Sequence, residues 1–349
     1  MKKSNLIKGL MFFSVFNLVI VFVTLPVYNC GSDITLPGSD DTTQAGNNNG
    51  YVTYWAETTD GGLSWDPLDS NYGSVNIKEI YAGVKITSQS GVFMMGGLDT
   101  LDRTAIWRST DYGETWNLVF NSAENDPIVK MKMNSVNNSI LAVTLYGDVY
   151  RSADLGSTWQ AVNIGNFIYD FDYFENSGRW IAVGGYGTAV YSDNSGATWL
   201  PGAVNIPIAF HEVCCVHNSS VAVAMAPTAM YRSTDGGLNY LNNFNPVNAT
   251  DISISANGNG LMVTSVANPP YYTTTDTGST WISAPVSASA FEFNDIVMIN
   301  NNLCLGTREN GIVYSTNMGQ SWNPTGILKK MYEINRQDHS SNYVFVLGE

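Results

Sequence analysis

Several acidic residues and tyrosines lie in polar segments between apolar runs, where their side chains can reach a ligand. Glycoside hydrolysis requires two carboxylates placed across a sugar-binding cleft, and tyrosines can stack on sugar rings. The residues that fit these roles are Asp99, Asp102, Glu124, Asp126 and Glu309, with Tyr146 and Tyr186. No spacing singles out one pair of acids, and exposed loop acids are common, so solvated loop charge is the favoured interpretation. We assign no catalytic residue from these positions.

The cysteines and histidines follow no metal-binding pattern. Cys214 and Cys215 are adjacent and Cys304 is distant, while His211 and His217 lie six residues apart. These spacings do not match those of zinc ligands. A strained disulfide between the adjacent cysteines is one alternative, but buried thiols are favoured for all three. We expect no metal and no other cofactor.

A repeated eight-residue pattern, called here the box, dominates the rest of the chain. It reads Ser/Thr-x-Asp/Asn-x-Gly-x-Ser/Thr/Asn-Trp/Tyr and occurs seven times. The acid or amide positions are Asp60, Asp111, Asp154, Asn194, Asp235, Asp276 and Asn317, at steps of 51, 43, 40, 41, 41 and 41 residues. The closing aromatics are Trp65, Trp116, Trp159, Trp199, Tyr240, Trp281 and Trp322. A near-constant period of this length indicates a repeat architecture.

Each box has the chemistry of a tight turn between two short strands. An Asp or Asn side chain can accept hydrogen bonds from nearby backbone N–H groups, and the Gly can adopt a positive φ. The aromatic then leads into the next strand, where its ring can pack beside the neighbouring repeat. Because a box occurs in every repeat, whereas a catalytic site occurs once, we interpret the box acids as structural.

The boxes resemble the Asp box, or bacterial neuraminidase repeat, of sialidases, some glycanases, sortilin-type receptors and photosystem II assembly-factor-like proteins. The resemblance covers Tyr51 to Glu349 and implies that each box joins the third and fourth strands of a four-stranded propeller blade. The chain is most similar to the photosystem II stability/assembly factor-like group, whose members are exported, often lipidated, and hold partner proteins without catalysis. It lacks an evident basic patch, so the chlorophyll-protein partner of that group is not carried over.

We therefore expect an all-β, seven-bladed β-propeller of four-stranded antiparallel blades over residues 51–349. The first box comes almost at the start of this domain, and two strands remain after the last box. We expect these N- and C-terminal strands to pair in one blade and close the ring, which removes open sheet edges. The innermost strands are expected at Glu79–Lys85, Val129–Asn134, Phe167–Phe174, Phe210–Val216, Asp251–Ala256, Phe291–Met298 and Lys330–Asn335.

The seven arginines argue against a sialidase. Sialidases hold the substrate carboxylate with three arginines on the face opposite the boxes. Arg108, Arg151 and Arg232 share one repeat position before a box and are interpreted as scaffold, and Arg179 and Arg336 fall on the box face. Only two arginines fall on the opposite face, and the Arg-Ile-Pro motif of sialidases is absent. The candidate binding face then comprises Asp99, Asp102, Arg103, Tyr146, Tyr186, Arg308 and Glu309.

The first 50 residues predict export and anchoring. Residues 1–29 have a basic start and a short apolar run, as signal peptides do. Cys30 follows in a context that resembles a lipoprotein cleavage site, and residues 30–50 form an acidic, flexible tether. Cleavage elsewhere and an uncleaved anchor are the alternatives. We expect a cell-envelope lipoprotein of the outer or inner membrane, with exposure at the cell surface as one alternative.

The net charge of −14 excludes nucleic acid as a partner, because phosphate binding requires clustered Lys and Arg. The hypothesis favoured by the sequence is a monomeric, non-catalytic binding or scaffold protein for a protein or glycan, held to the membrane by its N-terminal lipid. A glycoside hydrolase, sialidase-like or of another kind, is the alternative. A purely structural envelope component is the third possibility.

Overall fold

A computed structural model of the chain describes residues 54–58, 63, 66–68, 76–203, 208–246, 248–265, 271–283, 293, 295–308, 310–327, 331–336 and 344–348. The chain divides into two compact units, 1–48 and 49–349, and every described residue belongs to the second. The predicted signal peptide, Cys30 and the tether therefore lie outside the described residues, as do Asp60, Trp65 and Glu309.

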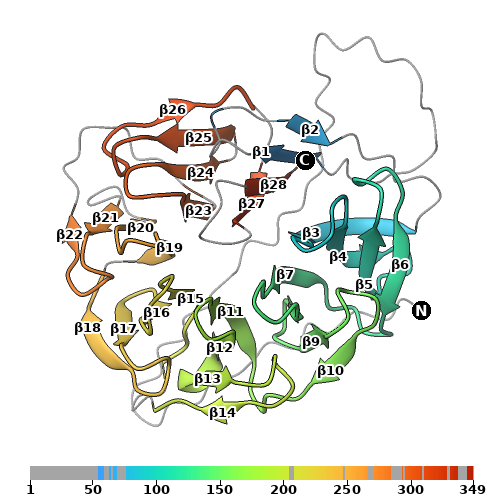
Figure 1. Ribbon diagram of the computed structural model, residues 1–349, viewed down its shortest axis with the longest axis horizontal. Coiled ribbons are helices and arrows are strands. Elements are labelled where there is room, and N and C mark those ends of the chain that lie inside the picture. Colours follow the sequence, from blue (N-terminus) through green and yellow to red (C-terminus); the bar gives the residue numbers. More distant parts are fainter. Residues whose placement is uncertain are drawn as a thin grey trace, which may run out of the picture. The chain divides into compact units, whose positions relative to one another are not determined.

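The described unit is a β-propeller, with four-stranded antiparallel sheets arranged around a central axis (Figure 1). Six blades consist of four consecutive strands each. The first blade comprises β3 (Ile77–Lys85), β4 (Phe93–Asp99), β5 (Thr104–Ser109) and β6 (Asn117–Asn121). The second comprises β7 (Ile128–Met133), β8 (Ile140–Thr144), β9 (Val149–Ser152) and β10 (Gln160–Val162). The third comprises β11 (Ile168–Phe174), β12 (Arg179–Gly184), β13 (Ala189–Ser192) and β14 (Leu200–Pro201). The fourth blade comprises β15 (Glu212–Cys215), β16 (Ala222–Ala226), β17 (Ala229–Ser233) and β18 (Leu241–Phe244). The fifth comprises β19 (Ala249–Ile254), β20 (Gly260–Thr264), β21 (Tyr271–Thr274) and β22 (Ile282–Ser283). The sixth comprises β23 (Asp295–Met298), β24 (Cys304–Arg308), β25 (Gly311–Ser315) and β26 (Asn323–Pro324).

A further four-stranded sheet joins the two ends of the described chain. It comprises β1 (Tyr54–Thr58), β2 (Asp66–Leu68), β27 (Met331–Arg336) and β28 (Val344–Gly348), in the order β2-β1-β28-β27. β1 pairs with β28 in antiparallel register from Tyr54↔Gly348 to Thr58↔Val344. The expected pairing of the terminal strands is therefore present. The innermost strands of successive sheets contact one another, and β27 contacts β3.

The predicted number of seven blades requires correction. The structure shows six blades of consecutive strands, and the remaining sheet is a composite of four strands from opposite ends of the chain. Counting boxes overcounts such blades, because the hairpin of the first box (β1–β2) has no inner strands preceding it and takes β28 and β27 instead. Only the backbone of this composite sheet is described.

The core lies between neighbouring sheets. The second strands β8, β16 and β20 are buried along their whole length, because an adjacent sheet covers each of their faces. One cluster joins Met225 and Val223 of β16 to Ile252 and Met262 of the next blade. The fourth strands lie at the rim and are largely exposed. Cys214, Cys215 and Cys304 are free, buried thiols within this core.

Candidate functional site

The six described box turns share one hydrogen-bond pattern, and it engages the acid or amide side chain in the turn itself. In the box of Asp154, the Ser152 hydroxyl donates to Asp154 Oδ1 at 2.8 Å and accepts the Gly156 N–H at 2.8 Å. The Thr158 N–H donates to Oδ1 at 2.8 Å, and its hydroxyl donates to Oδ2 at 2.6 Å. The same backbone N–H contact to Oδ1 forms at Asp111, Asn194, Asp235, Asp276 and Asn317. These side chains serve the turn and are not available to a substrate.

The box glycines and aromatics complete the turns. Gly156 has a φ of 80°, a conformation that side chains disfavour. Trp116 is 6% exposed, and its indole N–H donates to the Gly113 carbonyl at 2.9 Å. The other described aromatics are buried (Trp159, Tyr240 and Trp281) or partly buried (Trp199 and Trp322).

Arginines on the box face join neighbouring blades. Arg108, Arg151 and Arg232 each donate Nε–H to a backbone carbonyl in the box turn of the next blade, at Leu155, Ser195 and Thr277 respectively. The sequence predicted their common scaffold position but not this contact, which depends on the packing of separate blades.

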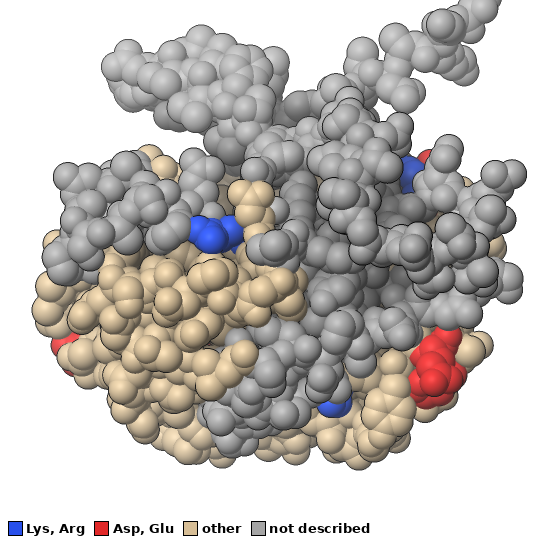
Figure 2. All heavy atoms as spheres, turned by 90° about the horizontal axis from the view of Figure 1, so that it is seen from above, with Lys and Arg blue, Asp and Glu red and all other residues tan. Residues whose placement is uncertain are grey.

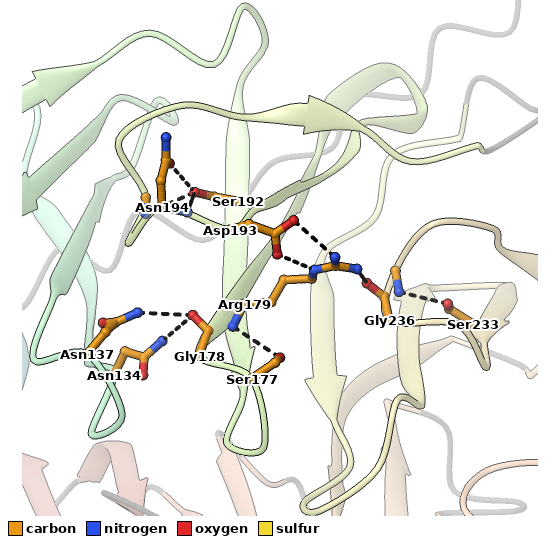
Figure 3. A network of polar contacts seen from close by, with 12 residues as sticks. Asn134, Asn137, Ser177, Gly178, Arg179, Ser192, Asp193, Asn194, Ser233 and Gly236 are labelled. Carbon is orange, nitrogen blue, oxygen red and sulfur yellow. Dashed lines mark hydrogen bonds and ion pairs between the residues drawn. The ribbon is translucent and has the colours of Figure 1, made fainter.

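The third blade has Tyr191 at the position that these arginines occupy, and Arg179 supplies the contact instead (Figure 3). Its guanidinium pairs with Asp193 at 2.6 and 3.0 Å, donates to the Gly236 carbonyl at 2.9 Å, and lies 4.7 Å from the centre of the Tyr191 ring. Arg179 is therefore on the box face, as predicted.

Three predicted site residues at the β4–β5 hairpin are held in local contacts. Asp99 is 1% exposed and accepts the Leu101 and Arg103 N–H groups at 2.9 and 3.0 Å. Its other oxygen pairs with the Arg103 guanidinium at 2.6 Å. Asp102 pairs with Lys78 at 2.5 Å. These contacts stabilise the hairpin and leave no pair of free acids there.

The remaining predicted acids and arginine do not form a catalytic pair either. Asp126 is buried, accepts the Tyr146 N–H at 3.1 Å, and has a raised pKa because burial disfavours its charge. Glu124 is exposed in the same link between blades. Arg308 ends β24, in a different part of the ring from both acids.

Tyr146 and Tyr186, by contrast, belong to one exposed aromatic patch. We define this aromatic patch as Leu145, Tyr146, Phe167, Tyr169, Tyr186 and His211. Tyr146 is 63% exposed, Tyr186 55% and Phe167 41%. The Tyr169 and His211 rings stack with centres 5.8 Å apart. The sequence predicted the two exposed tyrosines but missed the neighbours that make the patch continuous.

Charged residues of the inner strands meet at the axis, a feature that was not predicted from the sequence. The strand pairing places Ala82, Lys130, Asp170, Glu212, Asp251, Asp295 and Glu333 at the same register position of successive inner strands. We call Lys130, Asp170, Glu212, Asp251 and Asp295 the axial cluster. Their spacing of about one repeat was visible in the sequence, but a charge at a single position of a strand does not reveal that the strands converge.

The axial cluster is rich in carboxylates. The Lys130 amine lies 2.6 Å from Asp170 and 3.2 Å from Glu212, so this one cation forms ion pairs with carboxylates of two other blades. Burial raises the pKa of Glu212 well above its usual value, although Lys130 opposes the rise. Burial, the charge of Asp295 and a hydrogen bond with it raise the pKa of Asp251 well above its usual value.

The described residues contain neither a group of metal ligands nor a membrane-spanning helix. Within the part of the chain that the structure describes, no three His, Cys, Asp or Glu side chains are grouped to hold a metal ion. Among the same residues, no helix has the length and apolar character needed to cross a membrane. In the side view of Figure 2 the described surface is mostly uncharged, and no basic patch is visible on it.

The fold and these contacts define a β-propeller with ordered turns on one face and exposed aromatic loops on the other. No protein-family model matches the sequence, and no curated protein matches it. Among solved structures, YCF48 bound to a D1 peptide is similar, with a TM-score of 0.59 and 12% identity over 81% of this chain and 96% of that chain. YCF48 from Cyanidioschyzon merolae has a TM-score of 0.57 and 11% identity over 85% of this chain and 98% of that chain.

A glycosidase has a comparable likeness. The GH74 xyloglucanase from Xanthomonas campestris has a TM-score of 0.57 and 14% identity over 78% of this chain and 51% of that chain. At these identities the likeness shows a shared propeller fold, and fold alone does not decide between a binding protein and an enzyme.

Proposed function

We propose that the chain is an exported, lipid-anchored β-propeller that binds a protein or glycan partner without catalysis, through the face opposite the box turns. The observation that carries the proposal is the exposed aromatic patch. The predicted acids form no catalytic pair beside it, because Asp99 and Asp102 are held in ion pairs and Asp126 is buried. A propeller of this fold can hold a peptide, since the similar YCF48 was solved with a D1 peptide bound. The predicted signal peptide and Cys30 support export and anchoring.

Capture of partners from cell-envelope fractions tests the binding function. Parent protein is compared with a Tyr146→Ala/Tyr186→Ala variant and with a Leu200→Ala variant at the exposed rim. We expect the patch variant to lose partners that the parent and the rim variant retain. Recovery of the same partners by all three proteins would contradict the proposed face.

A glycoside hydrolase is the second candidate, favoured by one observation. Glu212 has a raised pKa because of its burial and lies beside other carboxylates, which is the condition for a general acid. Fluorogenic sialosides and a panel of polysaccharides test this function. We expect no turnover; turnover that Glu212→Gln abolishes would replace the binding function by an enzymatic one.

A further inference from the structure

The aromatic patch stands on loops of three successive blades that are joined by backbone hydrogen bonds. The Gly147 carbonyl accepts the Ile168 N–H at 3.2 Å, and the Phe167 carbonyl accepts the Gly185 N–H at 3.0 Å. The Gly184 carbonyl then accepts the Phe210 N–H at 3.0 Å. These bonds fix the loops relative to one another, so a ligand meets a preformed surface and less free energy is lost in ordering it.

Tyr186 has a left-handed backbone conformation in the loop between β12 and β13. Its φ of 56° and ψ of 32° place a bulky residue in the left-handed region, between Gly185 and Gly187. Box-turn residues such as Tyr112 and Leu155 have the same conformation, so at Tyr186 it shows a fixed turn. The side chain stays 55% exposed despite its apolar ring.

The segments of the patch carry charge of one sign, and Arg103, next to Thr104 that bonds to the Glu124 carbonyl, is already paired with Asp99. The segments that form the patch and its border are 122–127, 145–148, 166–169, 185–187 and 210–212, and they contain Glu124, Asp126, Asp148 and Glu212 but no Lys or Arg. Burial raises the pKa of Tyr150, and the nearby charges of Asp148, Asp126 and Glu124 raise it further. Tyr169 and His211 directly precede Asp170 and Glu212 of the axial cluster, whose single amine is already paired with both acids.

Exposed tyrosine rings bordered by carboxylates favour a cationic ligand. Lys and Arg side chains bind over aromatic faces and pair with carboxylates at the same time. A neutral sugar would use the rings but would gain nothing from the excess of negative charge. The net charge of −14 also attracts a basic segment over long range.

Resting on the proposed function, we propose that the aromatic patch binds an extended segment of a partner protein that carries Arg or Lys side chains. Tyr146 and Tyr186 receive the cationic side chains on their rings, and Glu124 and Asp148 pair with the charges. The partner chemistry is therefore a basic peptide, not a glycan.

Fluorescence anisotropy with the full chain tests this inference. The probes are a labelled Gly/Ser decapeptide with three Arg residues, matched peptides with Gln or Glu in place of Arg, and a neutral cello-oligosaccharide as competitor. We expect the Arg peptide to bind about tenfold or more tightly than the Gln and Glu peptides, with affinity that falls as salt rises. The oligosaccharide should not compete.

Matched variants distinguish binding at the aromatic patch from attraction by the overall negative charge of the protein. Tyr186→Ala should weaken binding of the Arg peptide about 3- to 30-fold, the range expected for a cation–π contact. Asp148→Asn with Glu124→Gln should weaken it and reduce its salt dependence. Glu114→Gln, at an exposed position in a box turn, should leave the affinity unchanged, and thermal melting checks that each variant is folded.

Three outcomes would overturn the inference. These are equal binding of the Arg and Gln peptides, an equal loss of affinity in Glu114→Gln, and competition by the oligosaccharide, which would show a glycan site. If the Arg peptide fails but envelope partners still require Tyr146 and Tyr186, the proposed function stands and only the cationic chemistry is wrong. If both assays fail, the face itself is wrong.

Discussion

At the residue scale, the Asp or Asn side chain of each box stabilises the turn by accepting hydrogen bonds on its oxygen atoms, and a negative charge is not required. Asn194 and Asn317 occupy the position of the acids, and their Oδ1 atoms accept the same backbone N–H at 2.9 Å. Their Nδ2 groups donate to the Thr198 and Ser321 hydroxyls, whereas Asp111, Asp154 and Asp276 accept from a hydroxyl at the same place. The chain therefore already contains both versions of one turn.

This comparison predicts how Asp154 variants behave. Asp154→Asn should change the free energy of unfolding by less than about 0.5 kcal/mol, whereas Asp154→Ala should cost about 1–2 kcal/mol by leaving turn N–H groups without an acceptor. Chemical denaturation measures both values. Equal losses in the two variants would show that the charge matters, contrary to the box pattern.

At the element scale, single arginines join one blade to the next across the box face. Arg179 shows the requirement clearly, because it reaches Gly236 and Asp193 from a different position of the blade than Arg108 or Arg151 does. A planar guanidinium can make both contacts and stack on Tyr191. An ammonium group lacks the planar, two-pronged arrangement of N–H donors that these contacts require.

Arg179→Lys should therefore lower the free energy of unfolding by about 1–2 kcal/mol although the charge is kept. Glu114→Gln, exposed on the same face, should change it by no more than about 0.5 kcal/mol. Thermal or urea melting compares the two variants with the parent. A lysine variant as stable as the parent would show that the contact between these blades does not require the guanidinium geometry.

At the scale of the whole molecule, convergence of the inner strands makes stability depend on pH. Because burial and Asp295 raise the pKa of Asp251, the folded protein keeps a proton that the unfolded protein releases. Stability contributed by this group is thus lost as the pH rises from the unfolded pKa, about 3.9, through the higher folded pKa.

Asp295→Asn should lower the pKa of Asp251, since it removes a charge while keeping a polar partner beside it. The variant should be more stable than the parent at about pH 8, by about 1.4 kcal/mol for each pKa unit removed, and the difference should shrink at about pH 5. Glu114→Gln, which removes an exposed charge in a box turn, is the control. A parent whose stability does not fall on raising the pH would contradict the raised pKa of Asp251.

Closure by the terminal strands also belongs to the whole molecule. Deleting residues 330–349 removes β27 and β28, so β1 loses its pairing with β28 and an open edge is exposed. We expect loss of cooperative melting and rapid proteolysis, with recovery when the missing segment is added as a peptide. A truncated protein that melts cooperatively would show that the composite sheet is not required.

The sequence by itself determined the all-β propeller, the box turns and the pairing of the two terminal strands, because these depend on local turn chemistry repeated at a constant period. It correctly predicted Arg179 on the box face and Tyr146 and Tyr186 as exposed. Only the tertiary structure decided that the first box belongs to a composite sheet and that Asp99 is held by Arg103. It alone brought Lys130, Glu212 and Asp251 together at the axis and joined Phe167, Tyr169 and His211 to the exposed tyrosines. The axial contacts link residues about one repeat or more apart, and the aromatic patch joins loops of three blades. Both depend on how separate blades pack, which no local pattern encodes.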